Sequence, residues 1–136
     1  MSNYIPKNLE FDKLGRNKLI QGITKISKAV KSTLGPRGRT VLIESPDHVG
    51  GITITKDGVT VANSIALENP IENLSVQMLK DAARRTANTA GDGTTTAIVL
   101  TEALVAAGEK YITEKNNVTE VVKKIKEQIP FVIDFL

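Results

Sequence analysis

Apolar residues recur every three or four positions through much of the chain, which is the spacing of one face of a helix. The first such run covers about 18 residues and ends at Gly35-Pro36, where glycine suits the left-handed residue after a helix and proline cannot continue one. Its apolar positions are Leu19, Ile20, Ile23, Ile26, Val30 and Leu34. This pattern predicts a long N-terminal helix with one buried face.

Two short β-branched segments follow this helix. Residues Thr40 to Glu44 favour a strand, and residues Gly51 to Lys56 alternate, with Ile52 and Ile54 on one face and threonines on the other. The polar stretch Ser45 to Gly50 separates the two segments. We therefore predict a β-hairpin.

The remaining periodic segments all favour helices. A short helix is expected after Asp57-Gly58, a longer one from Pro70 or Ile71 to Asn88, a third from Thr94 to about Glu109, and a last one from about Thr119. The apolar positions expected to face inward are Leu74, Met78, Leu79, Ala82, Ala83, Ala97, Ile98, Leu100, Leu104, Val105, Val121, Val122, Ile125 and Ile129. The predicted fold class is mainly α with one small β-hairpin.

The last eight residues, Ile129 to Leu136, are strongly apolar, whereas chain ends are usually polar and frayed. Such an ending is typical of a core element whose packing partners lie elsewhere. We therefore expect a fragment of a longer polypeptide, and a naturally short protein is the alternative.

The amino-acid composition excludes several kinds of functional site. The chain has 136 residues, the size of one domain, with 40% hydrophobic and only 4% aromatic residues, so an aliphatic core is expected. Cysteine is absent, which excludes disulfides, thiol catalysis and cysteine-based zinc sites. The single histidine, His48, is expected in a solvated loop and excludes a histidine metal cluster. Because no segment approaches the roughly 18 apolar residues of a membrane span and no signal peptide is visible, we expect no membrane partner and a cytoplasmic location.

The net charge of +3 is unevenly distributed. Residues 1–40 hold nine Lys and Arg against two acids, and residues 41–136 hold nine against thirteen. A basic third can indicate nucleic-acid binding. However, Lys18, Lys25, Lys28 and Lys31 fall between the apolar positions of the first helix, as a solvated face would. With only two aromatic residues there to stack on bases, we expect no nucleic-acid partner.

The segment Gly91 to Thr96, with the sequence Gly-Asp-Gly-Thr-Thr-Thr, is the most informative in the chain. It joins two predicted helices, and a helix N-terminus with free N–H groups is a natural phosphate site. Glycines let the backbone approach a ligand closely, and the Asp92 carboxylate suits Mg²⁺ held between protein and phosphate oxygens. The plainer alternative is that Asp92 simply caps the helix.

Two further motifs accompany this segment. Residues Thr33 to Arg39 (TLGPRGR) end a helix with two glycines among basic residues, and Thr53 to Val59 (TITKDGV) end a strand in a Lys-Asp-Gly turn. Taken alone, the first is equally a glycine helix cap and the second a simple turn. Together the three motifs supply backbone donors, an ammonium, a metal-binding carboxylate and a second carboxylate to orient water. The P-loop pattern G-x-x-x-x-G-K-[ST] is absent.

In their sequence and their order, the motifs TLGPRGR, TITKDGVTVA and AGDGTTTAIVL closely resemble the N-terminal equatorial segment of group I chaperonins, the GroEL family. The resemblance extends from about Lys13 to about Ile129. It implies that residues 1–136 are the N-terminal part of a multi-helical chaperonin equatorial ATP-binding domain, without the intermediate and apical domains. The whole protein would be a ring-forming, folding-coupled ATPase.

The resemblance also implies roles for individual residues. Asp92 would be the Mg²⁺ ligand, Lys56 would face the terminal phosphate of ATP, and Asp57 would help to orient the attacking water. A potassium ion would lie near Thr33 and Lys56. The residues that would contact the nucleotide and its phosphates are Thr33, Leu34, Gly35, Pro36, Lys56, Gly58, Gly93, Thr94, Thr95 and Thr96.

The chain departs from the family pattern in two ways. The expected hairpin loop looks slightly longer, with Gly51 where the family tends to have proline, so the contacts that this hairpin makes with a neighbouring subunit can differ. Family members are also several times longer. A second catalytic aspartate, the groups that hold adenine and ribose, and the parts that bind non-native polypeptides and a co-chaperonin lie beyond this segment, so the segment alone is expected to be inactive.

Two alternatives remain. One is a naturally short chaperonin relative that acts as a non-catalytic binding or regulatory subunit. The other is a basic, nucleic-acid-binding helical domain with a fortuitous Gly-Asp-Gly turn.

Overall fold

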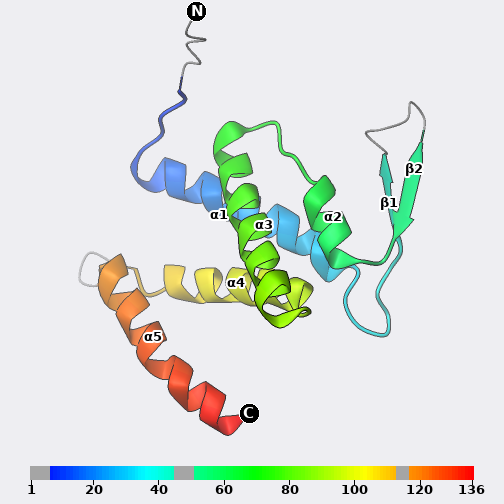
Figure 1. The fold of residues 1–136 in the computed structure, drawn as a ribbon. Coiled ribbons are helices and arrows are strands. Elements are labelled where there is room, and N and C mark those ends of the chain that lie inside the picture. Colours follow the sequence, from blue (N-terminus) through cyan, green and yellow to red (C-terminus); the bar gives the residue numbers. More distant parts are fainter. Residues whose placement is uncertain (1–6, 45–50, 113–116) are drawn as a thin grey trace, which may run out of the picture. The chain divides into compact units, whose positions relative to one another are not determined.

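A computed structural model describes residues 7–44, 51–112 and 117–136 (Figure 1). Within these residues the chain forms five helices and one two-stranded antiparallel sheet, which confirms the mainly α prediction with one hairpin. The elements are α1 (Asp12–Lys31), β1 (Val41–Glu44), β2 (Ile52–Thr55), α2 (Gly58–Ser64), α3 (Pro70–Ala90), α4 (Thr94–Glu109) and α5 (Val118–Phe135). They fall into two compact units, Met1–Glu102 and Ala103–Leu136.

The core of the first unit is a single aliphatic cluster, as the low aromatic content predicts. Helices α1, α2, α3 and α4 all contribute to it. Its buried members are Ile26, Val30, Val61, Ala62, Val76, Leu79, Ala83 and Ile98. Val41 and Ile43 of the hairpin pack against it, and this contact attaches the small sheet to the helices.

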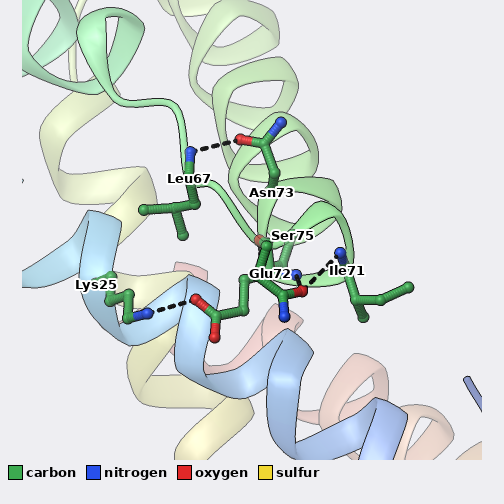
Figure 2. Close-up of polar contacts among 7 residues, drawn as sticks. Lys25, Leu67, Ile71, Glu72, Asn73 and Ser75 are labelled. Atoms are coloured by element: carbon green, nitrogen blue, oxygen red, sulfur yellow. Dashed lines mark hydrogen bonds and ion pairs between the residues drawn. The ribbon is translucent and has the colours of Figure 1, made fainter. Parts of the chain in front are cut away.

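Helices α1 and α3 pack closely against each other at Gly22. A Cβ atom there would lie 2.2 Å from both the Glu72 carbonyl oxygen and Ser75 Oγ, so only glycine fits. Beside this point Lys25 Nζ and Glu72 Oε2 form an ion pair at 2.5 Å (Figure 2). The Asn69 side chain caps α3 by accepting hydrogen bonds from the N–H groups of Ile71 and Glu72, at 3.0 and 3.2 Å.

The hairpin is in the predicted place, and each strand is shorter than predicted, with only four residues. Leu42 pairs with Ile54 and Glu44 with Ile52, so these four side chains share one face. Leu42, Ile52 and Ile54 are all about two-thirds exposed, and the opposite face carries Val41 and Ile43. The connecting residues 45–50, including His48, lie outside the described part.

The predicted inward face of α3 was partly wrong. Leu79 and Ala83 are buried, but Leu74 and Met78 are 56% and 70% exposed. The buried stripe instead includes Ser75 and two ionisable residues, Glu72 and Lys80. The buried face of α3 is therefore turned about the helix axis relative to the predicted face. Apolar spacing cannot reveal this difference, because the close packing at Gly22 favours small side chains and polar partners over the largest apolar residues. In α4 only Thr94 and Ile98 are buried, and Leu100 and Leu104 of the predicted face are exposed.

The second unit contains the end of α4 and α5. Asn117 caps α5 by accepting a hydrogen bond from the N–H group of Glu120 at 2.9 Å, and Pro130 lies inside the helix. Val121 and Ile125 line an apolar groove of about 320 Å³ against Leu104 and Gly108. The other two predicted inward positions of α5, Val122 and Ile129, are exposed. Among the described helices, none is long and apolar enough to cross a membrane.

Candidate nucleotide site

Asp57 is held in place by the start of α2. Its carboxylate accepts hydrogen bonds from the N–H groups of Val59 (3.3 Å) and Thr60 (2.9 Å) and from the Thr60 hydroxyl (2.6 Å). The Thr60 hydroxyl, followed by the Thr60 N–H group, holds the pKa of Asp57 below its ordinary value. The carboxylate is therefore ionised at neutral pH. Its Oδ1 atom makes only the long contact to Val59 and can accept another hydrogen bond.

The next residue, Gly58, connects two of the three motifs. It is buried, and a Cβ atom there would lie 2.3 Å from Thr95 Oγ1 and 3.2 Å from Thr95 Cβ and Cγ2. Because Gly58 is the first residue of α2 and Thr95 lies in the first turn of α4, the two helices begin in direct contact. The Lys-Asp-Gly turn and the Gly-Asp-Gly-Thr-Thr-Thr segment therefore lie side by side.

The loop between α3 and α4 depends on two glycines. Gly91 and Gly93 have φ angles of 77° and 81°, in the left-handed region. Asp92 lies between them, is exposed, and accepts a hydrogen bond from the N–H group of Gly93 at 2.6 Å. Gly93, not Asp92, occupies the position before the first residue of α4, and its carbonyl accepts the N–H group of Ala97 at 2.8 Å. Simple helix capping by Asp92 is thus not what the structure has.

The first turn of α4 carries three consecutive threonines. Thr94 is buried, Thr95 is half-buried and Thr96 is exposed. The N–H groups of this turn precede the first intrahelical hydrogen bond, so they are available to an acceptor outside the helix. The positive end of the helix dipole lies at the same place, which favours an anion.

The Thr33 loop is a closed turn at the end of α1. Gly35 has a φ angle of 78°, which confirms the predicted left-handed residue. Thr33 Oγ1 donates to the Val30 carbonyl at 2.7 Å, and the N–H group of Gly38 donates to the Gly35 carbonyl at 2.9 Å. A Cβ atom at Gly38 would lie 2.2 Å from the Thr33 carbonyl oxygen, so the loop is tightly packed on itself. Leu34, Gly35 and Pro36 are exposed.

One apolar cluster supports all three motifs. Val30 in the last turn of α1, Val61 in α2 and Ile98 in α4 belong to it. An ion pair between Lys31 and Glu102 also joins the end of α1 to α4. Across residues 7–44 and 51–112, however, no hydrogen bond or ion pair joins the Thr33–Pro36 loop to the other two motifs. Lys56 is exposed, directly before Asp57.

The acidic groups suit a cation that is held mainly by phosphate oxygens. In the described part of the chain, no three His, Cys, Asp or Glu residues are grouped to hold a metal by themselves. Mg²⁺ commonly binds through one or two carboxylates together with substrate phosphates and waters. The exposed Asp92, next to the free N–H groups of α4, fits this kind of site.

Comparison with known proteins identifies the family. The model of the TCP-1/cpn60 chaperonin family matches residues 26–136. The chain belongs to this chaperonin family. A crystal structure of the chaperonin gp146 from bacteriophage EL 2 (Pseudomonas aeruginosa), determined in the presence of ATP-BeFx, is similar, with 34% sequence identity and a TM-score of 0.68 over 76% of this chain and 18% of that chain. A second crystal form of gp146 gives 33% identity and a TM-score of 0.65, over 75% and 18%. The chaperonin chain described here thus spans about a fifth of the length of gp146.

Lys80 lies close to the motifs of this chaperonin segment, but it was not identified from the sequence. Lys80 of α3 is 6% exposed, and its Nζ atom donates to the carbonyl oxygens of Asn63 and Ile65, at the end of α2. A signal was present, because Lys80 follows Val76 by four residues and precedes Ala83 by three, so it falls on the buried stripe. Its polarity instead favours a surface position.

Proposed function

We propose that this chain supplies the phosphate- and magnesium-binding side of an ATP site in a chaperonin subunit. The whole protein would couple ATP hydrolysis to the folding of non-native polypeptides. The observation that best supports the proposal is the contact between Gly58 and Thr95, because it unites the Lys56-Asp57-Gly58 turn with the start of α4. The presence of ATP-BeFx in crystals of gp146 is consistent with a nucleotide site in this family.

The proposed roles follow from charge and position. Asp92 binds Mg²⁺ together with phosphate oxygens, and the N–H and hydroxyl groups of Thr94, Thr95 and Thr96 donate to the phosphates. The N–H group of Gly93 exchanges its hydrogen bond to Asp92 for one to a phosphate oxygen. The Lys56 ammonium faces the terminal phosphate and neutralises charge that moves as the phosphoryl group leaves ADP.

Asp57 has a different role, because its carboxylate is already oriented by Thr60. Its Oδ1 atom accepts a hydrogen bond from the water that attacks the terminal phosphorus. The Thr33–Pro36 loop lies against the nucleotide, and potassium near Thr33 and Lys56 adds positive charge. A second carboxylate and the adenine-binding groups come from parts of the protein beyond residue 136.

Subunit contacts are the second part of the proposal. The face of the hairpin that carries Leu42, Ile52 and Ile54, with Glu44 at its end, is mainly apolar and exposed, which supports contact with another copy of this chain in a ring. Non-native polypeptides and a co-chaperonin bind elsewhere on the complete protein, and the assembly works in the cytoplasm. Neither a nucleic acid nor a membrane is a partner.

The test compares nucleotide binding by the purified complete protein and its Lys56→Met variant, which keeps the side-chain length and removes the charge. Equilibrium titrations with Mg-ATP and Mg-ADP should show a loss of about tenfold or more for ATP and much less for ADP, because only ATP has the terminal phosphate. Lys28→Met, at an exposed position of α1, is the control and should bind both normally. Equal losses for the two nucleotides would place Lys56 away from the terminal phosphate, and a protein that binds neither nucleotide would refute the ATP site.

A further inference from the structure

Lys80 is a buried lysine with no role in the proposed chemistry. Its residue is 6% exposed, and Nζ donates to the Asn63 carbonyl at 2.9 Å and to the Ile65 carbonyl at 2.7 Å. These carbonyls lie in the last turn of α2 and directly after it, where backbone oxygens have no intrahelical partner. The ammonium therefore satisfies the C-terminus of α2 and lies at the negative end of its dipole.

Helix α2 needs such support because it has only seven residues, or about 10 Å. A helix this short is not stable by itself in water. The structure holds it at both ends, with the Asp57 side chain capping the first turn and Lys80 binding the last. At the first end Gly58 also touches Thr95. A displacement at either end of so short a helix moves the other end too.

These contacts form a closed frame, which we define as α2, α3, the Gly91–Gly93 loop and α4. Lys80 joins α2 to α3, the loop follows directly after α3, and the contact between Gly58 and Thr95 joins α4 back to α2. Asp57 lies at one corner of this frame and Asp92 at another. Their separation therefore depends on each connection of the frame, together with the aliphatic cluster that α2, α3 and α4 share.

Burial of the Lys80 charge has an energetic cost. Desolvation, with a smaller contribution from Arg84, lowers the pKa of Lys80. Methionine would fill a similar volume without that penalty. Proteins with buried charged groups are often no more stable than variants that carry apolar residues at the same positions. The cost is explained if the lysine specifies the position of α2 rather than adding stability.

We propose that Lys80 is a positioning residue for the ATP site, which holds α2 so that Asp57 keeps its place relative to Asp92 and the bound phosphates. This inference rests on the proposed function. Lys80 touches neither nucleotide nor metal in this scheme, and it acts only through the two carbonyl groups that it binds.

The test is steady-state ATP hydrolysis by the purified complete chaperonin that contains this chain, with Lys80→Met, Lys80→Arg and Arg85→Met. Arg85 is an exposed cation on the same helix and serves as the matched control. In Lys80→Met we expect kcat to fall by about ten- to a hundredfold with KM for ATP changed less than threefold, because misplacement of a reacting group by about 1 Å affects chemistry more than binding. Lys80→Arg, which keeps charged donors, should recover most of the rate, and Arg85→Met should be normal.

A folded Lys80→Met protein with normal kcat would overturn the inference. A loss of kcat/KM that comes only from a higher KM, with kcat unchanged, would also overturn it. So would a Lys80→Arg variant that is no faster than Lys80→Met. If Lys80→Met does not fold, Lys80→Gln keeps one N–H donor group and is judged by the same criteria. Asp92→Ala is measured alongside, since its normal turnover would refute the proposed site itself, whereas its inactivity beside a normal Lys80→Met would refute only the role of Lys80.

Discussion

Gly58→Ala perturbs the contact on which the candidate site depends. The added Cβ would lie 2.3 Å from Thr95 Oγ1 and 3.2 Å from both Thr95 Cβ and Cγ2. Rotation of the threonine side chain can move Oγ1 away, but Thr95 Cβ does not move with it, and its distance of 3.2 Å is still shorter than ordinary van der Waals contact. The start of α2 must therefore move away from the start of α4.

The free-energy cost of Gly58→Ala is the difference between two opposing contributions. Overpacking by one methyl group typically costs about 1–3 kcal/mol, and alanine is favoured over glycine in a helix by roughly 0.5–1 kcal/mol. The net cost of keeping Gly58→Ala in the native geometry is then roughly 0–2.5 kcal/mol, with a midpoint of about 1.2 kcal/mol. The free protein avoids this cost by separating the two motifs. ATP binding needs them together, so the midpoint cost should reduce ATP affinity by about eightfold.

The assay is a double-mutant cycle on ATP affinity, measured by isothermal titration calorimetry. Thr95→Ala removes Oγ1 and Cγ2 and leaves only Cβ, at 3.2 Å from the new methyl group. Thr95→Ala also removes a proposed phosphate donor, so the test is the coupling: the loss of ATP affinity in the double variant should be about 1 kcal/mol smaller than the sum of the two single losses. Strictly additive losses would refute the reasoning, because they would mean that Gly58 and Thr95 do not share a steric constraint.

Three further substitutions, one of them paired with a control substitution, test other parts of the structure. Gly22→Ala should lower the thermal midpoint because its Cβ meets α3 at 2.2 Å, whereas Gly108→Ala, with its nearest atom at 3.9 Å, should leave the midpoint unchanged or raise it. The lowered pKa of Asp57 adds stability that is present above about pH 4 and is lost as the pH falls through the folded-state value. Asp57→Ala should therefore destabilise the protein by about 1 kcal/mol at pH 7 and by less at pH 3, measured by denaturant unfolding at both pH values. Gly35→Val should reduce both stability and ATP affinity, because a β-branched residue is strained at a φ angle of 78°, and unchanged values would show that the loop can adapt.

Local signals predicted most of the secondary structure. The apolar spacing, the Gly35-Pro36 stop and the β-branched pairs identified the helices and the hairpin, because each depends on neighbouring residues alone. The predicted left-handed Gly35 is confirmed by its φ angle of 78°. The predicted fold class and chaperonin family are confirmed as well.

Contacts between distant residues were not predictable in the same way. The exposed Leu74 and Met78 follow from the close approach of α1 and α3 at Gly22, and the buried Lys80 follows from its hydrogen bonds to the end of α2. A single helix pattern contains neither contact. The contact between Gly58 and Thr95 likewise depends on how α2 and α4 pack on one cluster. The roles given to Asp57, Lys56 and Asp92 stay predictions, because they concern a ligand and not the chain itself.

A structure of the protein bound to Mg²⁺ and a non-hydrolysable ATP analogue tests the central claim most directly. We predict a carboxylate oxygen of Asp92 about 2.1 Å from the metal and phosphate oxygens within hydrogen-bonding distance of the N–H groups at the start of α4. A nucleotide bound away from the Gly91–Thr96 segment, or a Mg²⁺ ion without Asp92 in its coordination shell, would contradict the account.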